Sequence, residues 1–231
     1  MLETDAKIKF EVAQKNFENK NYKKAQKLWL EILDYYPKNL SVLRNVALAF
    51  YHDDDLEKAQ MILKKIIKIN KKEPKALVML ILILERQDKI DETMKYIDLG
   101  LKENILDKHW EVKKELMLPT IFEDVKDIDE SRNKLLKYIQ EVLESNKKIS
   151  LDIESQLIKP VQFNLSYSQH GNLEINKKCA NFFRKIYPQL NNVHKLKNTS
   201  NSKIRIGFIS DYLTDHTIGK LFKGIILNLD K

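Results

Sequence analysis

A recurrence every 34 positions in the first part of the chain constrains its fold more than any other feature. Alanine returns at this spacing twice, at Ala13 and Ala47 and again at Ala25 and Ala59. Four further pairs of large residues keep the same offset: Phe17 with Tyr51, Tyr22 with Leu56, Trp29 with Leu63, and Ile32 with Ile66. A short unit repeated with small and large apolar residues at fixed places predicts stacked helix pairs that bury their apolar sides against one another.

The small residues have a steric role in this plan. At Ala13 and Ala25 two helices can approach closely because no γ-carbon intervenes, and Trp29 then covers the seam between them. Pro37 ends the second helix of the unit. We assign Trp29 and Trp110 to packing rather than to a ligand site, since large aromatic residues at helical spacing are usually core.

The third unit, which Pro74 opens, departs from the pattern. Its first helix is apolar nearly all round (Leu77, Leu80, Ile81, Leu84), so we expect both of its faces to be covered. Its second helix has Thr93, Ile97 and Gly100 at the positions of the small and large residues. We predict that residues 1–118 form tetratricopeptide-like helical repeats, a family that the 34-residue unit of two helices resembles.

Composition supports a mainly α fold and excludes several classes of site. Five glycines and five prolines are too few for a protein built of many tight turns. One cysteine and five scattered histidines offer neither a disulfide framework nor metal-ligand spacing, so we expect no cofactor and no metal. The start lacks the features of a signal peptide, and the longest apolar run, Ala76 to Leu84, is too short to span a membrane, which predicts a cytoplasmic protein without a membrane partner.

The net charge of +8 does not indicate a nucleic-acid partner. Only five of the 41 basic residues are arginines, and the lysines are spread along helical faces among Asp and Glu. A nucleic-acid site would concentrate basic residues beside exposed aromatic side chains. We therefore read the lysines as solvated helix faces.

The second half of the chain changes character. Residues 119–190 read as a helical connector with helices at 127–145, capped by Asp127 or Asp129, and at 173–187. Residues 191–202 are polar and form the expected linker. Residues 203–231 begin with KIRIGFIS at Lys203 and predict a buried β-strand, a turn and a helix, which is how a Rossmann-like domain begins; we expect only the start of such a domain here.

The whole layout resembles tetratricopeptide proteins with an O-linked N-acetylglucosamine transferase-like catalytic domain of the two-Rossmann (GT-B) type. The resemblance is most specific over Ile204 to Leu221, where Ser210, His216, Gly219 and Leu221 fall in the family's places. Lys220 stands where the family has a second histidine. The resemblance implies sugar transfer from a UDP-sugar to protein Ser or Thr, with the donor held by a second Rossmann domain that this sequence lacks.

Two residues are candidate site residues. His216 is the candidate catalytic residue, because the family's histidine at that place lies between acceptor and donor; from the residues alone it also suits a turn or a helix cap. Asn45 is the candidate acceptor-peptide ligand, because the transferase's repeats carry a ladder of asparagines there, although the equivalent Glu11 and Met79 are not asparagine. The remaining histidines (His52, His109, His170, His194) are expected at the surface.

Two functions are consistent with these features. The first is the amino-terminal part of a protein O-linked N-acetylglucosamine transferase-like glycosyltransferase, whose repeats bind the acceptor protein and which would use a UDP-sugar only together with the rest of its catalytic domain. The alternative is a non-catalytic tetratricopeptide adapter that binds protein partners.

Overall fold

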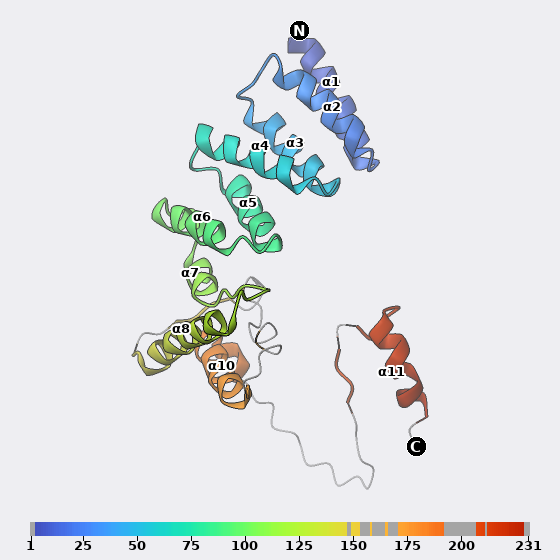
Figure 1. Cartoon of the computed structure of the whole chain (residues 1–231). Coiled ribbons are helices and arrows are strands. Elements are labelled where there is room, and N and C mark those ends of the chain that lie inside the picture. Colours follow the sequence, from blue (N-terminus) through green and yellow to red (C-terminus); the bar gives the residue numbers. More distant parts are fainter. Residues whose placement is uncertain are drawn as a thin grey trace. The chain divides into compact units, whose positions relative to one another are not determined.

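The structure is a computed structural model that describes residues 3–146, 149–152, 158, 165, 171–191, 207–210 and 212–228. The chain divides into two compact units, Met1–Asn192 and Val193–Lys231. The first unit contains the repeats together with the connector helices, and the described residues of the second include helix α11 (Thr217–Leu227; Figure 1).

Three helix pairs succeed one another along the first unit, as the 34-residue recurrence predicts. Each pair packs first helix against second, and each second helix packs against the first helix of the next pair. The six helices are α1 (Glu3–Glu18), α2 (Tyr22–Leu33), α3 (Leu40–His52), α4 (Leu56–Ile69), α5 (Pro74–Arg86) and α6 (Ile90–Lys102).

Alanine allows the first two pairs to close. Ala13, Ala25, Ala47 and Ala59 have no exposed surface, and Trp29 is buried against Phe10 and Phe17, with ring centroids 6.1 and 5.8 Å away. The assignment of Trp29 and Trp110 to packing is therefore confirmed. Because the helices approach closely at the alanines, each pair behaves as one layer of a tetratricopeptide-type solenoid.

The turns inside the pairs repeat with the same period. Lys20, Asp54 and Asp88 each adopt a left-handed backbone, with φ of 60°, 62° and 57°. Each turn closes the first helix with two backbone hydrogen bonds, the outer ones being Asn21 N–H to Asn16 O, Asp55 N–H to Phe50 O, and Lys89 N–H to Leu84 O. This is the Schellman ending that usually has glycine at its left-handed position. The chain uses lysine or aspartate instead.

The glycine of the third pair, Gly100, is explained by the segment after α6. A β-carbon on Gly100 would lie 2.4 Å from Leu106 Cδ1 and 2.8 Å from Leu77 Cδ2, so only glycine lets that segment pack here. Six of the thirteen residues of α5 are buried, but one stripe is not, since Leu82 is 46% exposed. The expectation that both faces of α5 are covered is thus wrong for this stripe.

Among the described residues, three further helices contribute to a second core in the same unit. They are α7 (Lys108–Glu115), α8 (Val125–Glu144) and α10 (Leu173–Ile186), the last continuing into the 3-10 helix η2 (Pro188–Asn191). Helix α7 joins the two cores, because Trp110 belongs to the core of the repeats whereas Val112 and Leu116 belong to the second core. The predicted cap of α8 was wrong: Asp124, not Asp127 or Asp129, accepts the hydrogen bond from Asp127 N–H.

The second unit does not show the predicted strand. Residues 207–210, the described part of that segment, are not in a strand, and Lys203 to Ile206 lie outside the described residues. A strand needs a neighbour to satisfy its backbone groups, and the part of this unit that the structure describes offers no partner strand. The predicted helix is present as α11 (Thr217–Leu227), with no buried residue. A Rossmann-like start is therefore not supported.

The left-handed turns allow a direct test. Replacing Lys20 by glycine removes the strain of a β-carbon at φ 60° and should raise the free energy of unfolding by about 0.5–1 kcal/mol. Urea denaturation of both proteins measures the difference. A glycine in place of Lys15, inside α1, serves as the control and should lower stability instead. Loss of stability in Lys20→Gly would contradict the repeated Schellman turn.

The second core predicts a dependence on alkaline pH. Burial raises the pKa of Tyr138 to about 12, with smaller contributions from Glu111 and Glu115. The folded chain therefore keeps this proton above pH 10, where the unfolded chain loses it, and the stabilisation present below pH 10 disappears as the pH rises toward 12. Wild type should lose stability more steeply in this range than Tyr138→Phe. Parallel curves for the two proteins in chemical denaturation would refute the assignment.

Candidate protein-binding face

The first helix of each pair leaves one stripe of side chains uncovered. Residues spaced by four, three and four positions lie on one side of a helix, and the same three stripes recur at the repeat period. We call these residues together the open face: Lys7, Glu11, Gln14 and Glu18 on α1; Ser41, Asn45, Leu48 and His52 on α3; Lys75, Met79, Leu82 and Arg86 on α5. Gln14, Asn45, Leu48 and Met79 are half-buried and the others are exposed.

Contacts at both ends hold α3 and α5 side by side in the same direction. Arg44 of α3 pairs with Glu73, the residue before α5, and Arg86 at the end of α5 pairs with Asp54 after α3, at 3.0 Å. The ends of α1 and α3 also meet, since the rings of Phe17 and His52 are 5.5 Å apart. The three stripes are consequently parallel rows of one surface.

The centre of the open face is apolar. Leu48, Met79 and Leu82 lie at the middle of the stripes on α3 and α5, together with Asn45, whose side chain makes no hydrogen bond with any other described residue. Lys7 and Lys75 lie at the rim, and neither forms an ion pair within the described part of the chain. The face therefore combines apolar contact area on α3 and α5 with one uncommitted amide and two lysines that form no described ion pair, and α1 adds the exposed carboxylates of Glu11 and Glu18.

A hollow of about 700 Å³ adjoins the face between α1 and the start of α3. Lys7 stands among its lining residues, and Phe10, Tyr36 and Val42 supply apolar wall. The hollow has room for one or more side chains of a bound segment.

The other charges of the repeats are largely used within the fold. Lys64 of α4 donates to Glu92 of α6 at 2.6 Å, and this hydrogen bond holds the pKa of Glu92 below its usual value. Lys9 lowers the pKa of Glu31 in the same way, and Lys113 pairs with Glu85 at 2.7 Å. These pairs tie neighbouring helices together.

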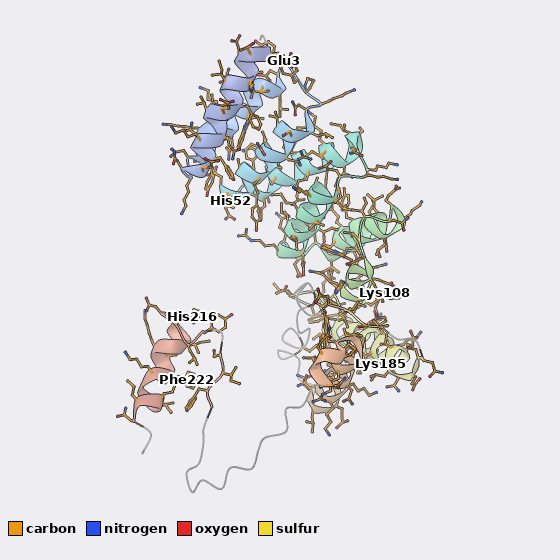
Figure 2. The ribbon with its side chains drawn as sticks, turned by 180° about the vertical axis from the view of Figure 1, so that it is seen from behind. Glu3, His52, Lys108, Lys185, His216 and Phe222 are labelled. Atoms are coloured by element: carbon orange, nitrogen blue, oxygen red, sulfur yellow. The ribbon has the colours of Figure 1, made fainter. Side chains whose placement is uncertain are left out.

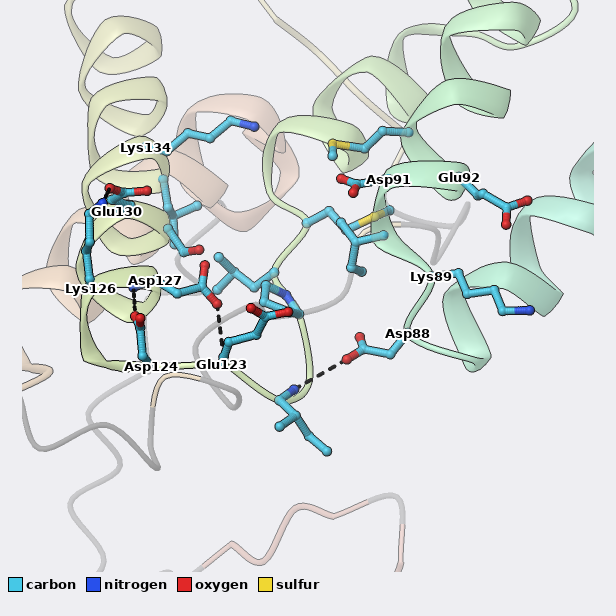
Figure 3. Close-up of a pocket in the computed structure, with 18 of the residues that line it drawn as sticks. Asp88, Lys89, Asp91, Glu92, Glu123, Asp124, Lys126, Asp127, Glu130 and Lys134 are labelled. Atoms are coloured by element: carbon cyan, nitrogen blue, oxygen red, sulfur yellow. Dashed lines mark hydrogen bonds and ion pairs between the residues drawn. The ribbon is translucent and has the colours of Figure 1, made fainter.

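An acidic hollow of about 730 Å³ lies between the start of α6 and α8 (Figure 3). Its carboxylates mainly serve the chain itself. Asp88 accepts hydrogen bonds from Thr120 N–H at 2.9 and 3.0 Å, and Asp127 accepts one from Glu123 N–H at 3.2 Å. We therefore read the hollow as the junction that fixes the segment between α7 and α8.

The predicted catalytic residue, His216, is the N-cap of α11. Its Nδ1 accepts a hydrogen bond from Ile218 N–H at 3.2 Å, and its ring lies 4.5 Å from that of Tyr212. Lys220, in the place of the family's second histidine, pairs with Asp215 at 2.8 Å. Figure 2 shows His216 at the start of the helix. Within its own unit this residue therefore has a structural partner.

The presence of glycine at position 219 is explained by the turn before α11. A β-carbon there would lie 2.4 Å from Thr214 O and 2.8 Å from Tyr212 O, so the turn can fold over the start of α11 only because this residue is glycine. Ser210 accepts a hydrogen bond from Tyr212 N–H in the same turn. The turn that precedes the helix is thus present.

Of the histidines expected at the surface, His52 is exposed and stacks on Tyr22, whereas the expectation for His109 was wrong. The His109 side chain is only 14% exposed; its Nε2 accepts a hydrogen bond from Asp152 N–H at 3.0 Å, and its Nδ1 lies 3.1 Å from Asp107. Both ring nitrogens are occupied, so His109 braces α7 rather than serving as a base. His170 and His194 lie outside the described residues.

Within the described residues, no group of three or more His, Cys, Asp or Glu side chains could hold a metal ion. The same residues include no helix that is long and apolar enough to cross a bilayer.

Comparisons with known proteins extend to fold only. No family model and no curated protein matches the chain. Among solved structures, the MamA protein has a TM-score of 0.51 at 14% identity, covering 83% of this chain and 97% of that one. The first tetratricopeptide domain of Spaghetti (RPAP3), bound to an HSP90 peptide, has a TM-score of 0.40 at 17% identity, covering 60% and 96%. The Sgt2 tetratricopeptide domain from Aspergillus fumigatus has 0.39 at 17%, covering 64% and 88%.

The cap at His216 predicts the effect of its removal. His216→Ala should destabilise the start of α11 by about 1 kcal/mol, which hydrogen exchange of residues 217–220 measures as faster exchange. His216→Asp keeps an acceptor at the N-cap and should exchange like wild type. Equal protection in His216→Ala would show that the cap contributes nothing to the helix.

Proposed function

We propose that the repeats bind a segment of another protein on the open face. The observation that carries this proposal is Leu82, an apolar side chain left 46% exposed on α5, although its neighbours Leu80, Ile81, Ile83 and Leu84 are fully buried. Uncovered apolar surface flanked by polar groups is typical of an interaction site.

The same face suggests the chemistry of the bound segment. Leu48, Met79 and Leu82 favour one or more apolar side chains, and flexible methionine adapts to their shape. Asn45 offers both a donor and an acceptor to an extended backbone. Lys7 and Lys75 at the rim favour a carboxylate, from an acidic residue or a chain end. The segment we expect is therefore extended, apolar and acidic.

The solved neighbours agree with this proposal without carrying it. One of them, the Spaghetti (RPAP3) domain, was solved with a peptide of sequence SRMEEVD, which contains apolar and acidic residues. The identity is too low to transfer that ligand to this chain.

Peptide selection tests the proposal. Peptides selected from a random display library on the wild-type chain should contain an apolar residue near an acidic one. Leu82→Glu should abolish their binding, because a carboxylate would enter the apolar centre and repel the acidic group. Asn45→Ala should weaken binding by up to about tenfold, the worth of one hydrogen bond. Fluorescence polarisation with a labelled selected peptide measures both.

Met61→Glu is the matched control. Met61 is also an exposed apolar residue, 70% exposed, but it lies on α4 outside the open face. The proposal fails if Met61→Glu weakens binding as much as Leu82→Glu, or if Leu82→Glu binds normally. Circular dichroism of each variant confirms that the helices remain folded.

A second candidate is the transferase that the resemblance implies, with the repeats binding its acceptor and His216 acting at the catalytic centre. One observation favours it: with Nδ1 accepting from Ile218, the proton of neutral His216 is on Nε2, which makes no hydrogen bond with a described residue and could donate to a substrate. It rests otherwise on the resemblance over Ile204 to Leu221. Supplying the remaining catalytic portion as a second chain separates the candidates: the transferase predicts sugar transfer from UDP-N-acetylglucosamine that His216→Ala lowers by about 10²-fold or more, whereas the adapter predicts no transfer.

A further inference from the structure

The first helix exposes an apolar edge that every later repeat buries. On α1, Ile8 and Val12 are 58% and 47% exposed. The residues 34 positions later, Val42 and Val46, are 2% and 0% exposed in the core that α2 and α3 share. The same two positions of the repeat are thus exposed to solvent on α1 and buried on α3.

The third repeat buries the same two positions. Ala76 and Leu80 occupy the equivalent positions on α5 and are buried where α5 packs against α4. At each internal edge, the second helix of one repeat covers the first helix of the next. Among the described residues, no helix precedes α1 to do the same. The edge of α1 therefore has the shape and chemistry that receives a helix.

Helix α6, at the other end of the repeats, is not available to cover the α1 edge of a second copy. There α6 packs against α7, and Leu106 fills the space that Gly100 leaves. A head-to-tail stack would have to displace these contacts. The α1 edge of a second copy, by contrast, is uncovered and equally apolar.

The charges beside the apolar pair match such an arrangement. Asp5, Ile8, Val12 and Lys15 are spaced by three, four and three positions and form a single stripe on α1. Two such stripes packed antiparallel bring Ile8 level with Val12 of the second copy and Asp5 level with Lys15 of the second copy. A two-fold axis repeats each of these contacts, giving two ion pairs and two apolar contacts.

We propose that two copies of this chain associate through the edges of their α1 helices, antiparallel and about a two-fold axis. The stripe lies on a different side of α1 from the open face, so dimerisation leaves peptide binding possible. This inference does not depend on the proposed function. One helix on each side buries less area than a standard stable interface, so the dimer should be weak and depend on concentration.

Sedimentation of the full chain from micromolar to near-millimolar concentration tests the proposal. The average mass of wild type should rise from 27.3 kDa toward twice that value. Asp5→Lys should place lysine against lysine, and Lys15→Asp aspartate against aspartate, so each variant should dimerise at least about tenfold more weakly. An equimolar mixture of these two variants restores both ion pairs and should regain association.

The controls change the same charges elsewhere. Asp91→Lys makes in the first turn of α6 the same charge change that Asp5→Lys makes in the first turn of α1. Lys65→Asp makes the same change as Lys15→Asp at an exposed position of α4. Both control variants should dimerise like wild type. A wild-type chain that remains monomeric at every concentration overturns the proposal. If the mixture of the two variants associates no better than each variant alone, the antiparallel arrangement is overturned. If the control variants also lose association, net charge and not the α1 edge governs dimerisation, and the proposal is overturned.

Discussion

The close approach of paired helices at small residues supports the rest of this structure. Ala13 against Ala25 and Ala47 against Ala59 let each pair form a thin layer, and layers of constant thickness can stack in register. Register in turn aligns the stripes of α1, α3 and α5. The open face therefore results from packing on the opposite side of α1, α3 and α5. Its side chains are those that point away from the core when the alanines face it.

The sequence predicted the repeats well because their signal is periodic and local. It predicted α5 less well, since an all-apolar helix does not reveal which stripe its neighbours leave bare; Leu48 and Leu82 become visible only when the repeat register is extended from Asn45. Asp124 was missed as a cap because three aspartates compete within six residues. The predicted strand is not supported over residues 207–210, the part of it that the structure describes, for a different reason: strands depend on partners distant in sequence, and no periodic pattern supplies them.

Helix α7 gives the first unit its continuity. Trp110 packs into the core of the repeats while Val112 and Leu116 pack into the core with α8 and α10. His109 and Asp88 add polar ties on either side of the same junction. The connector is thus not a loose tether after the repeats, and any segment bound to the open face meets a rigid support. A binding surface on rigid helices loses little conformational entropy when it is occupied.

Gly100 has a consequence for how such a chain can change its length during evolution. Solenoids commonly grow by duplication of a unit, and a duplicated unit must fit a neighbour on each side. A copy of the third repeat placed after itself would bring a glycine shaped for Leu106 against a different helix, leaving an unfilled gap. New repeats can be gained far more easily ahead of α1. A glycine where the earlier repeats have isoleucine, Ile32 and Ile66, therefore makes the third repeat difficult to duplicate in place.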